Sequence, residues 1–423
     1  MKKISVIIIG AGSRGTHYSG FLKEHPEIEV VAVAEPRDFY RDKMGEDWNI
    51  PAERRFRDWR EVAAFPERIA DAAVIATSDN VHTGPAIAFA NQGYHLLLEK
   101  PMASTLAECE AIVKAAKENN IIFAVCHVLR YTTYTQKVKE LLDSGAIGEL
   151  VNIQHIESVM YWHQAHSYVR GNWRNEEESS SMLLAKSCHD IDLFRYWVGR
   201  KCKRVSSFGS LKFFRRENQP AGAADRCTDC PKEVESQCPY SAVKIYWRDR
   251  AKSGYWRWPI DVVTEKPTRD ALFQALKDGP YGRCVFACDN DVVDHQAVIL
   301  EFENGVTVDF TMTAFTPNGG RRYTRFCGTK GYLEGDGAEI TSYNYLDDSV
   351  KKIELNHDFS GTIEDGHGGG DGRLVRNWVN ALVAGSPEAL LTGPDETLES
   401  HRIVFAAEQS RRENSTVVLP EDV

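Results

Sequence analysis

The first third of the chain alternates short apolar runs with stretches of helical periodicity. The apolar runs are Ile4 to Ile9, a second run that ends at Glu35, "AAVIAT" (72–77), "YHLLLEKP" (94–101) and "IIFAVCH" (121–127), and helical patterns begin near 82 and 105. Strands that are apolar throughout and are separated by helices are typical of a parallel sheet covered on both faces. The pattern therefore predicts an α/β domain over residues 1–127.

From about residue 128 the pattern changes to longer stretches of β character. These stretches are 149–160, 203–214, 292–302, 305–315, 321–328 and 331–346, and helices are expected near 371–384 and 396–412. The segment "AVILEFENGVTVDFTM" alternates apolar and polar positions around "ENG", which predicts a hairpin. Antiparallel strands in a row suit one sheet with an exposed or oligomer-forming face. We expect a second α/β domain over 128–423, with a cysteine-containing insertion near 220–290.

The segment 181–197 has helical spacing but an unusual face. At about 100° per residue, Lys186, His189 and Asp190 share one stripe with the large apolar residue Trp197. Surface helices usually keep charged and apolar residues on opposite sides. One interpretation is a helix end that leaves the core, with the lysine ammonium reaching solvent. The other is the wall of a substrate cleft.

Composition excludes several partners. The chain has 423 residues, a formal net charge of −10 and a pI near 5.8, which argues against nucleic acid or an anionic membrane. No apolar run approaches the roughly 20 residues that span a bilayer. The amino terminus leads into a glycine turn instead of a signal-peptide cleavage site. We therefore expect a cytoplasmic protein, in which ten cysteines are not a disulfide scaffold.

The first apolar run leads into the sequence "GAGSRG". Gly10, Gly12 and Gly15 form the G-x-G-x-x-G pattern of dinucleotide-binding domains, with Ser13 and Arg14 at the start of the following helix. The first glycine permits a tight turn, the second lets the backbone approach pyrophosphate, and the third permits close helix–strand packing. An ordinary glycine-rich turn is the alternative, but strand, glycines, helix and second strand in this order favour a dinucleotide site.

The second apolar run ends in a carboxylate that bears on the choice of cofactor. Glu35 lies about 20 residues beyond the glycines, where an acidic side chain accepts both ribose hydroxyls and repels a 2′-phosphate. Arg37 lies two residues further on and could bind such a phosphate instead. The pattern favours NAD over NADP.

Polar residues gather at the predicted carboxyl ends of successive strands, where ligands of parallel sheets bind. They are Thr77, Ser78, Asn80, His82, Glu99, Lys100 and His127. A lysine such as Lys100 beside a nicotinamide could polarise a hydroxyl or carbonyl oxygen. The alternative is a surface pair of Glu99 and Lys100 before Pro101, whose peptide bond could be cis. We expect Thr77, Asn80, His82, Glu99 and Lys100 to contact the cofactor.

Together, "GAGSRG", "ATSDNVHTGPA", "LLEKPMA", "VCHVLRY" and "CHDIDL" resemble the Gfo/Idh/MocA family of glucose–fructose oxidoreductase and inositol dehydrogenase. These pieces span about residues 1–200. The resemblance implies an amino-terminal Rossmann domain and a carboxyl-terminal α/β domain whose large, mostly antiparallel sheet often forms an oligomer interface. It also implies a homodimer or homotetramer that oxidises or reduces a secondary alcohol on a sugar or cyclitol.

The resemblance assigns the active-site lysine to Lys100 and the active-site histidine to His189. Many members carry an aspartate four residues before that histidine, but this chain has Ala185 there and Lys186 next to it. Lys186 is our candidate to replace the aspartate. We expect His189 to take the hydroxyl proton and Lys100 to polarise the oxygen, although either could be the base. Two alternatives are a redox-neutral NAD-dependent glycosidase and a nucleotide-sensing regulator without catalysis.

Further residues are candidates for binding a carbohydrate ring because they carry aromatic faces or polar donors. They are His127, Arg130 and Tyr131, then Trp162, His163, Trp173 and Arg174 of a loop-like stretch at 160–175, and His367 of the glycine-rich "GHGGGDGR". The alternative for 160–175 is an interface or a loop packed on the sheet. In the glycine-rich segment we expect Asp371 to cap the following helix.

Three cysteines in a polar stretch have spacing suited to a metal. Cys227, Cys230 and Cys238 lie in "CTDCPKEVESQC", and Cys284 or Cys288 could supply a fourth thiolate. Four thiolates suit a structural zinc ion, and an iron–sulfur cluster uses the same ligands. The alternatives are free thiols or a disulfide.

Overall fold

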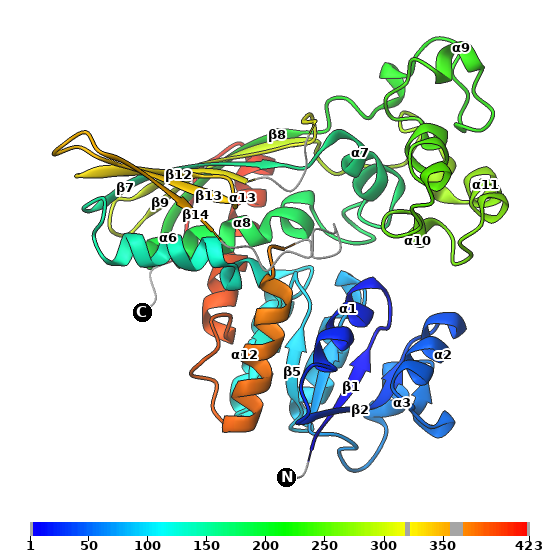
Figure 1. Cartoon of the computed structure of the whole chain (residues 1–423), viewed down its shortest axis with the longest axis horizontal. Coiled ribbons are helices and arrows are strands. Elements are labelled where there is room, and N and C mark those ends of the chain that lie inside the picture. The colour runs from blue at the N-terminus through cyan, green and yellow to red at the C-terminus, as the bar shows by residue number, and fades with distance from the viewer. Residues whose placement is uncertain (1–2, 318–321, 356–366, 421–423) are drawn as a thin grey trace.

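The computed structural model describes residues 3–317, 322–355 and 367–420 and has two domains (Figure 1). The amino-terminal domain is built on a six-stranded parallel sheet in the order β3-β2-β1-β4-β5-β6. Its strands are β1 (Ile4–Ile9), β2 (Ile28–Ala34), β3 (Arg55–Phe56), β4 (Ala72–Ile75), β5 (His95–Leu98) and β6 (Phe123–Val125). Its helices are α1 (Ser13–Leu22), α2 (Asp38–Asp47), α3 (Trp59–Ala63), α4 (Thr83–Asn91) and α5 (Leu106–Glu118).

The apolar composition of the central strands explains their place in this sheet. Residues 6–9 of β1 and all of β4 are buried, since helices cover both faces. Helix α5 begins at a capping box in which Thr105 and Glu108 bond reciprocally. The strand order reverses between β1 and β4, and ligands of such sheets bind at this switch point.

The second domain is built on a nine-stranded sheet in the order β14-β13-β12-β11-β7-β10-β9-β8-β15. Its strands are β7 (Leu150–Ser158), β8 (Cys202–Ser210), β9 (His295–Phe302), β10 (Thr307–Thr313), β11 (Arg322–Gly328), β12 (Gly331–Gly335), β13 (Glu339–Asn344), β14 (Val350–Glu354) and β15 (Val417–Val418). Within this second sheet, β7 and β10 form the only parallel pair among the described strands. The predicted fold class and the β9–β10 hairpin are confirmed.

Helices cover one face of this sheet. They are α6 (Thr133–Asp143), α8 (Met182–Val198) and α13 (Pro394–Glu413), and Figure 1 shows α6 and α8 between the sheet and the amino-terminal domain. The strands alternate accordingly: β7 buries Ile153 and His155 and exposes Val151 and Ile156. The helix predicted at 181–197 is α8, which lies where the two domains meet.

Helix α12 (Gly370–Ala384) lies in the range predicted for the second domain but packs on the first. Its apolar side chains Leu374 and Trp378 share a core with Val6 of β1 and Tyr18 of α1. After β14 the chain therefore returns to the nucleotide-binding domain before β15 completes the large sheet (Figure 1). No helix in the described ranges is both long and apolar enough to cross a membrane.

An insertion fills residues 211–294, between the adjacent strands β8 and β9. It carries the short helices α9 (Lys232–Glu235), α10 (Ile260–Val263) and α11 (Arg269–Asp278) around a small core of its own. Its edge reaches the nucleotide-binding domain, where Tyr40 Oη lies 3.5 Å from the Asp261 carbonyl oxygen.

The loop-like conformation predicted for 160–175 is wrong over most of its length. The chain is helical there, with α7 (Tyr161–His163) followed by a π-helical stretch (Gln164–Arg170). Ala165, Tyr168 and Val169 recur at helical spacing and are buried, a signal that the many polar and aromatic residues of the segment obscured.

Candidate functional site

The turn after β1 has the geometry that a dinucleotide requires. Gly10 has φ +89°, and a Cβ there would lie 2.5 Å from the Ala76 carbonyl oxygen. A Cβ on Gly15 would lie 1.9 Å from the Gly10 carbonyl oxygen, so no larger residue fits. Gly12 caps α1 without a side-chain hydrogen bond, which leaves the first amides of the helix, beginning at Ser13, to bind an anion. These residues fit a pyrophosphate.

Glu35 follows β2 at the ribose position. Its Oε2 accepts a hydrogen bond from the Ala11 amide at 2.9 Å, and its Oε1 accepts one from Arg37 Nε at 2.7 Å. Burial acts to raise the pKa of Glu35, but hydrogen bonds and charge from Arg37 outweigh it and hold the pKa below its ordinary value. The carboxylate is ionised at neutral pH and anchored next to the glycine turn.

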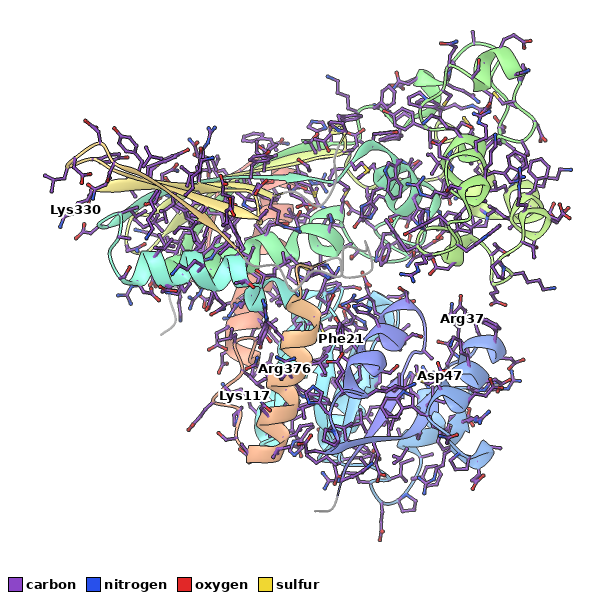
Figure 2. The ribbon with its side chains drawn as sticks, in the orientation of Figure 1. Phe21, Arg37, Asp47, Lys117, Lys330 and Arg376 are labelled. Atoms are coloured by element: carbon purple, nitrogen blue, oxygen red, sulfur yellow. The ribbon has the colours of Figure 1, made fainter. Side chains whose placement is uncertain are left out.

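Arg37 is half exposed and projects from the edge of the domain that faces the insertion (Figure 2). Its guanidinium lies 4.2 Å from the ring centroid of Tyr40. In the described arrangement Arg37 binds Glu35, so the two side chains predicted to compete over the cofactor's 2′ position form one ion pair.

Arg14 turns toward the protein interior. Its Nε lies 2.6 Å from Glu99 Oε1, and its Nη2 lies 2.6 Å from Asp371 Oδ1 in the first turn of α12. Tyr18 Oη donates to the same Glu99 oxygen at 2.9 Å. The predicted cofactor residues Arg14 and Glu99 thus form a network that joins the glycine turn, the end of β5 and α12.

The expectation that Asp371 caps α12 is wrong. The cap residue is Gly369, with φ +75° and no side-chain hydrogen bond. Asp371 is buried and binds Arg14 and, at 2.9 Å, His367 Nδ1. Its position directly after three glycines suggested a cap, whereas its partner Arg14 lies 357 residues earlier in the chain.

The polar residues after β4 take different positions. Thr77 Oγ1 is buried and has no hydrogen-bond partner among the described residues, so it is available to a ligand. Asn80 donates to the Glu178 carbonyl at 3.1 Å. His82 is fully buried, with its ring nitrogens 2.7 Å from the Pro101 carbonyl and 3.2 Å from the Thr77 carbonyl. His82 therefore ties the end of β4 to the turn after β5.

Lys100 follows β5 and reaches across to the second domain. Its Nζ donates to the Ala185 carbonyl oxygen of α8 at 2.7 Å, and the Lys100–Pro101 peptide bond is cis. Ala185 stands one helical turn before His189, on the same face of α8. The Lys100 ammonium is thus bonded one helical turn from His189, near enough for its charge to act on that imidazole.

His189 is 4% exposed and has two other imidazoles close to its ring. Its ring centroid lies 5.5 Å from that of His367 and 5.7 Å from that of His127. Burial and, after it, the positive charge of Lys100 hold the pKa of His189 well below its ordinary value. The imidazole is therefore neutral at pH 7, and its Nδ1 has no hydrogen-bond partner within the described residues. A neutral histidine with an unused nitrogen can receive a proton.

Lys186 is paired with a carboxylate that sequence patterns did not reveal. Its Nζ lies 3.1 Å from Oε1 of Glu157, a fully buried residue of β7. Arg322 of β11 lies 3.1 Å from the other Glu157 oxygen and 2.6 Å from Asp190. In β7 the strand alternation marks position 157 as inward-facing, which is the one signal that could have found this carboxylate.

Two predicted substrate residues lie near this centre. His367 lies beside His189. Burial and then the charge of Lys186 hold the pKa of His163 well below its ordinary value, so His163 lies within electrostatic reach of the site. Trp162 stands next to His163 and packs against Trp258 of the insertion, with ring centroids 5.4 Å apart. The insertion and α7 therefore form one aromatic wall near Lys186.

Two other predicted substrate residues bond within the protein, whereas both ring nitrogens of a third, His127, have no hydrogen-bond partner among the described residues. Arg130 binds Asp192 through two hydrogen bonds of 2.6 and 2.7 Å, and Tyr131 Oη accepts one from the Leu391 amide at 3.0 Å. His127 is fully buried beside these residues.

Two further members of the predicted set lie at the edge of the domain interface. Trp173 Nε1 donates to Asp79 at 3.0 Å, and Arg174 binds Asp289 at 2.9 and 3.0 Å. These bonds attach the stretch after the π-helical segment to the end of β4 and to the insertion.

Family models match both parts of the chain. "Oxidoreductase family, NAD-binding Rossmann fold" of Gfo/Idh/MocA matches residues 4–127, and "Oxidoreductase family, C-terminal alpha/beta domain" matches 139–419. The putative oxidoreductase YteT of Bacillus subtilis is 23% identical over 400 residues, which cover 88% of each chain. Levoglucosan dehydrogenase of Pseudarthrobacter phenanthrenivorans is 29% identical over 206 residues, 47% of this chain and 52% of that protein.

Solved structures share the fold. A levoglucosan dehydrogenase in complex with NADH and levoglucosan has a TM-score of 0.70 and 19% identity, covering 99% of this chain and 100% of that one. An Agrobacterium radiobacter oxidoreductase in complex with NAD⁺, L-tartaric acid and magnesium has a TM-score of 0.71 and 16% identity, covering 99% and 98%.

Proposed function

The chain belongs to the Gfo/Idh/MocA oxidoreductase family, and from that premise we propose that it is an NAD-dependent oxidoreductase. Its substrate is a secondary alcohol of a sugar, glycoside or cyclitol, or the corresponding ketone. Levoglucosan dehydrogenase and a myo-inositol 2-dehydrogenase of Thermotoga maritima, 26% identical over 204 residues (48% of this chain and 58% of that protein), are among its relatives and support this substrate class.

The observation that carries the proposal is the bond from Lys100 Nζ to the Ala185 carbonyl, one helical turn from His189. This bond supports a site in which the Lys100 ammonium and the neutral His189 imidazole face a nicotinamide at the carboxyl edge of the sheet. A regulator that only senses a nucleotide has no need of an acid–base pair at this position.

A bound nicotinamide supplies or accepts the hydride. His189 takes the hydroxyl proton during oxidation, because its lowered pKa keeps it unprotonated at neutral pH. The Lys100 ammonium donates a hydrogen bond to the same oxygen and stabilises the negative charge that develops on it. In the reverse direction the protonated imidazole returns the proton.

We assign Lys186 to positioning. Its pairing with Glu157 fixes the ammonium in the wall that holds His163. It stands next to Ala185, the position where the family resemblance implies an aspartate, and a lysine donor there can hold a ring hydroxyl. His163, His367 and Trp162 complete the substrate wall, since aromatic faces and few fixed donors suit a carbohydrate ring.

Glu35 makes NAD the preferred cofactor. An ionised carboxylate bound to the Ala11 amide is placed to accept the ribose hydroxyls and to repel a 2′-phosphate. When the ribose binds, Arg37 can remain on the far oxygen of Glu35 or lie along Tyr40.

The exposed face of the nine-stranded sheet is our candidate for contact with a second copy of the chain. Neighbouring strands expose the apolar side chains of Val151, Ile156, Phe208, Ile299 and Tyr323 on it. Exposed apolar side chains gathered on one sheet face suit contact with another protein surface, and a homodimer or homotetramer would bury them.

The experiment for the activity is nicotinamide absorbance after mixing the protein and NAD⁺ with hexopyranosides, aryl glycosides and inositols. A rise with one substrate class, lost in Lys100→Ala, supports the oxidoreductase and names the class. A flat trace with cleaved glycoside in the product would instead identify the redox-neutral glycosidase. A flat trace with no product would contradict catalysis on these substrates.

A further inference from the structure

Four cysteines of the insertion line one small cavity. They are Cys227, Cys230, Cys238 and Cys284. The cavity volume is about 20 Å³, which is enough for one atom-sized occupant. Three of these cysteines come from one stretch of sequence, and the fourth lies 46 positions after Cys238, so the fold brings it there.

Backbone pairing places the distant cysteine beside the others. Arg226 and Arg283 form an antiparallel bridge. Next to it the Cys227 amide donates to the Gly282 carbonyl at 2.9 Å, and the Cys284 amide donates to the Asp225 carbonyl at 2.8 Å. Cys227 and Cys284 therefore flank one bridge.

A buried arginine beside this cavity has no carboxylate partner in the part of the chain that the structure describes. Arg170 is 1% exposed, and its bonds go to the carbonyls of Arg283 and Tyr240 and, at 3.5 Å, to Cys227 Sγ. Its Nη1 has no hydrogen-bond partner among the described residues. Glu235 also lines the cavity, but it is already bound by Arg248 at 2.7 and 2.8 Å. A buried cation needs a compensating negative charge.

We propose that Cys227, Cys230, Cys238 and Cys284 bind one thiophilic divalent metal ion of the zinc class, with Arg170 as its counter-cation. Four thiolates around a divalent ion carry a net charge of −2, which supplies the negative charge that Arg170 lacks. The cavity size favours one ion over a cluster of several irons.

The thiols are not yet converged on a metal position. In the described residues no group of three or more histidine, cysteine, aspartate or glutamate side chains is set to hold an ion, so the zinc site predicted from three cysteines is not present as a formed site. Ligation requires the four thiols to move closer together, and binding releases their protons to solvent.

The site joins the insertion to the aromatic wall. Arg170 is the last residue of the π-helical stretch that follows Trp162 and His163. The cysteines belong to the insertion, whose Trp258 packs against the rings of Trp162 and His163. An ion at the four thiols would therefore fix the substrate wall without touching the nicotinamide side.

The test is metal analysis of the full-length protein purified without added chelator, with Co²⁺ then exchanged into the site. About one zinc per chain is expected, with the sulfur-to-metal charge-transfer and intense visible bands of tetrahedral Co²⁺. Cys230→Ser and Cys284→Ser should each lose most of the metal. Cys288→Ser is the matched control, because Cys288 lies in the same insertion and its thiol bonds the Cys284 carbonyl. It should keep the metal.

Three results would overturn the proposal. The wild-type protein could hold no metal and give no Co²⁺ bands, or both Cys230→Ser and Cys284→Ser could retain zinc. The third is a wild-type protein that contains iron and inorganic sulfide in place of zinc. If a variant fails to fold, titration of wild-type thiols with a mercurial decides instead. Zinc should be released as the thiols react, and reaction without release of zinc contradicts the site. None of these readouts depends on the redox activity.

Discussion

Arg14 Nη2 lies 2.6 Å from Asp371 Oδ1, and this bond joins the glycine turn to a helix from the far end of the chain. Asp371 is 3% exposed, so loss of its charge leaves a largely buried guanidinium with one carboxylate partner fewer. We expect Asp371→Asn to lower the free energy of unfolding by about 2–3 kcal/mol, near the low end for a broken buried pair because Arg14 is partly exposed.

Denaturant unfolding followed by circular dichroism measures this loss. Asp47→Asn is the control, because Asp47 forms an exposed pair with Lys43 on α2 (Figure 2) that should contribute at most about 0.5 kcal/mol. The double variant Arg14→Met/Asp371→Asn should lose less stability than the sum of the two single variants. Equal losses in Asp371→Asn and Asp47→Asn would contradict the role of the bond.

Cofactor preference depends on the Glu35 carboxylate. Glu35→Ser removes the negative charge at the ribose and frees Arg37 to bind a 2′-phosphate. The ratio of the Kd for NADPH to that for NADH, measured by fluorescence, should fall about tenfold or more, equivalent to about 1.4 kcal/mol. Asp38→Ser, which removes an exposed carboxylate bound to Arg41, should leave the ratio unchanged. Tighter binding of NADPH than NADH by the wild-type protein would refute the assignment.

Buried histidines make stability depend on pH. Burial lowers the pKa of His401 to about 4 and that of His127 to about 3. The unfolded chain binds these protons near pH 6.5, whereas the folded chain does not, so stability is full above pH 6.5 and falls as the pH drops toward 4. His401 alone contributes up to about 3 kcal/mol to this fall.

The His401→Gln variant should therefore lose stability less steeply between pH 6.5 and 4.5 than the wild-type protein. Unfolding free energies measured at several pH values give the slope of stability against pH for each protein. Comparing the two slopes removes any loss of stability that the substitution causes equally at every pH. His25→Gln, at a partly exposed position, is the control. Identical slopes in the wild-type and His401→Gln proteins would count against a neutral buried His401.

The exposed sheet face predicts self-association. Phe208 and Ile299 are 67% and 44% exposed there, and a buried charge in an apolar interface is costly. We expect Phe208→Glu to shift the protein toward the monomer in light scattering. Val383→Glu, on the outer side of α12, should not. A monomeric wild-type protein would rule out this interface.

The sequence predicted the parts of the site whose partners are close in the chain. Gly10, Gly12 and Gly15 belong to one turn, and their spacing reports the backbone approach that the turn requires. Alternation and helical periodicity likewise placed β7, β9, β10 and α8 because each depends on its own residues.

Pairs between distant segments could not be predicted in this way. Lys186 meets Glu157 across a helix–sheet contact, and Arg14 meets Asp371 across almost the whole chain. The periodicity of apolar residues indicates which face of a helix or strand is buried. It does not indicate which residue of another helix or strand packs against that face. The same limit explains why Cys284 could be named only as one of two candidates to accompany Cys227.

We expect Lys100 and His189 to act on the substrate oxygen, whereas the glycine turn and Glu35 supply most of the affinity for the dinucleotide. Steady-state turnover of Lys100→Met and His189→Asn with the substrate class found in the panel, together with NADH affinity of each variant by fluorescence, tests this most directly. A fall of about 10² to 10⁴-fold in kcat with near-normal NADH affinity is predicted. Near-normal turnover in both variants would contradict a catalytic role for Lys100 and His189.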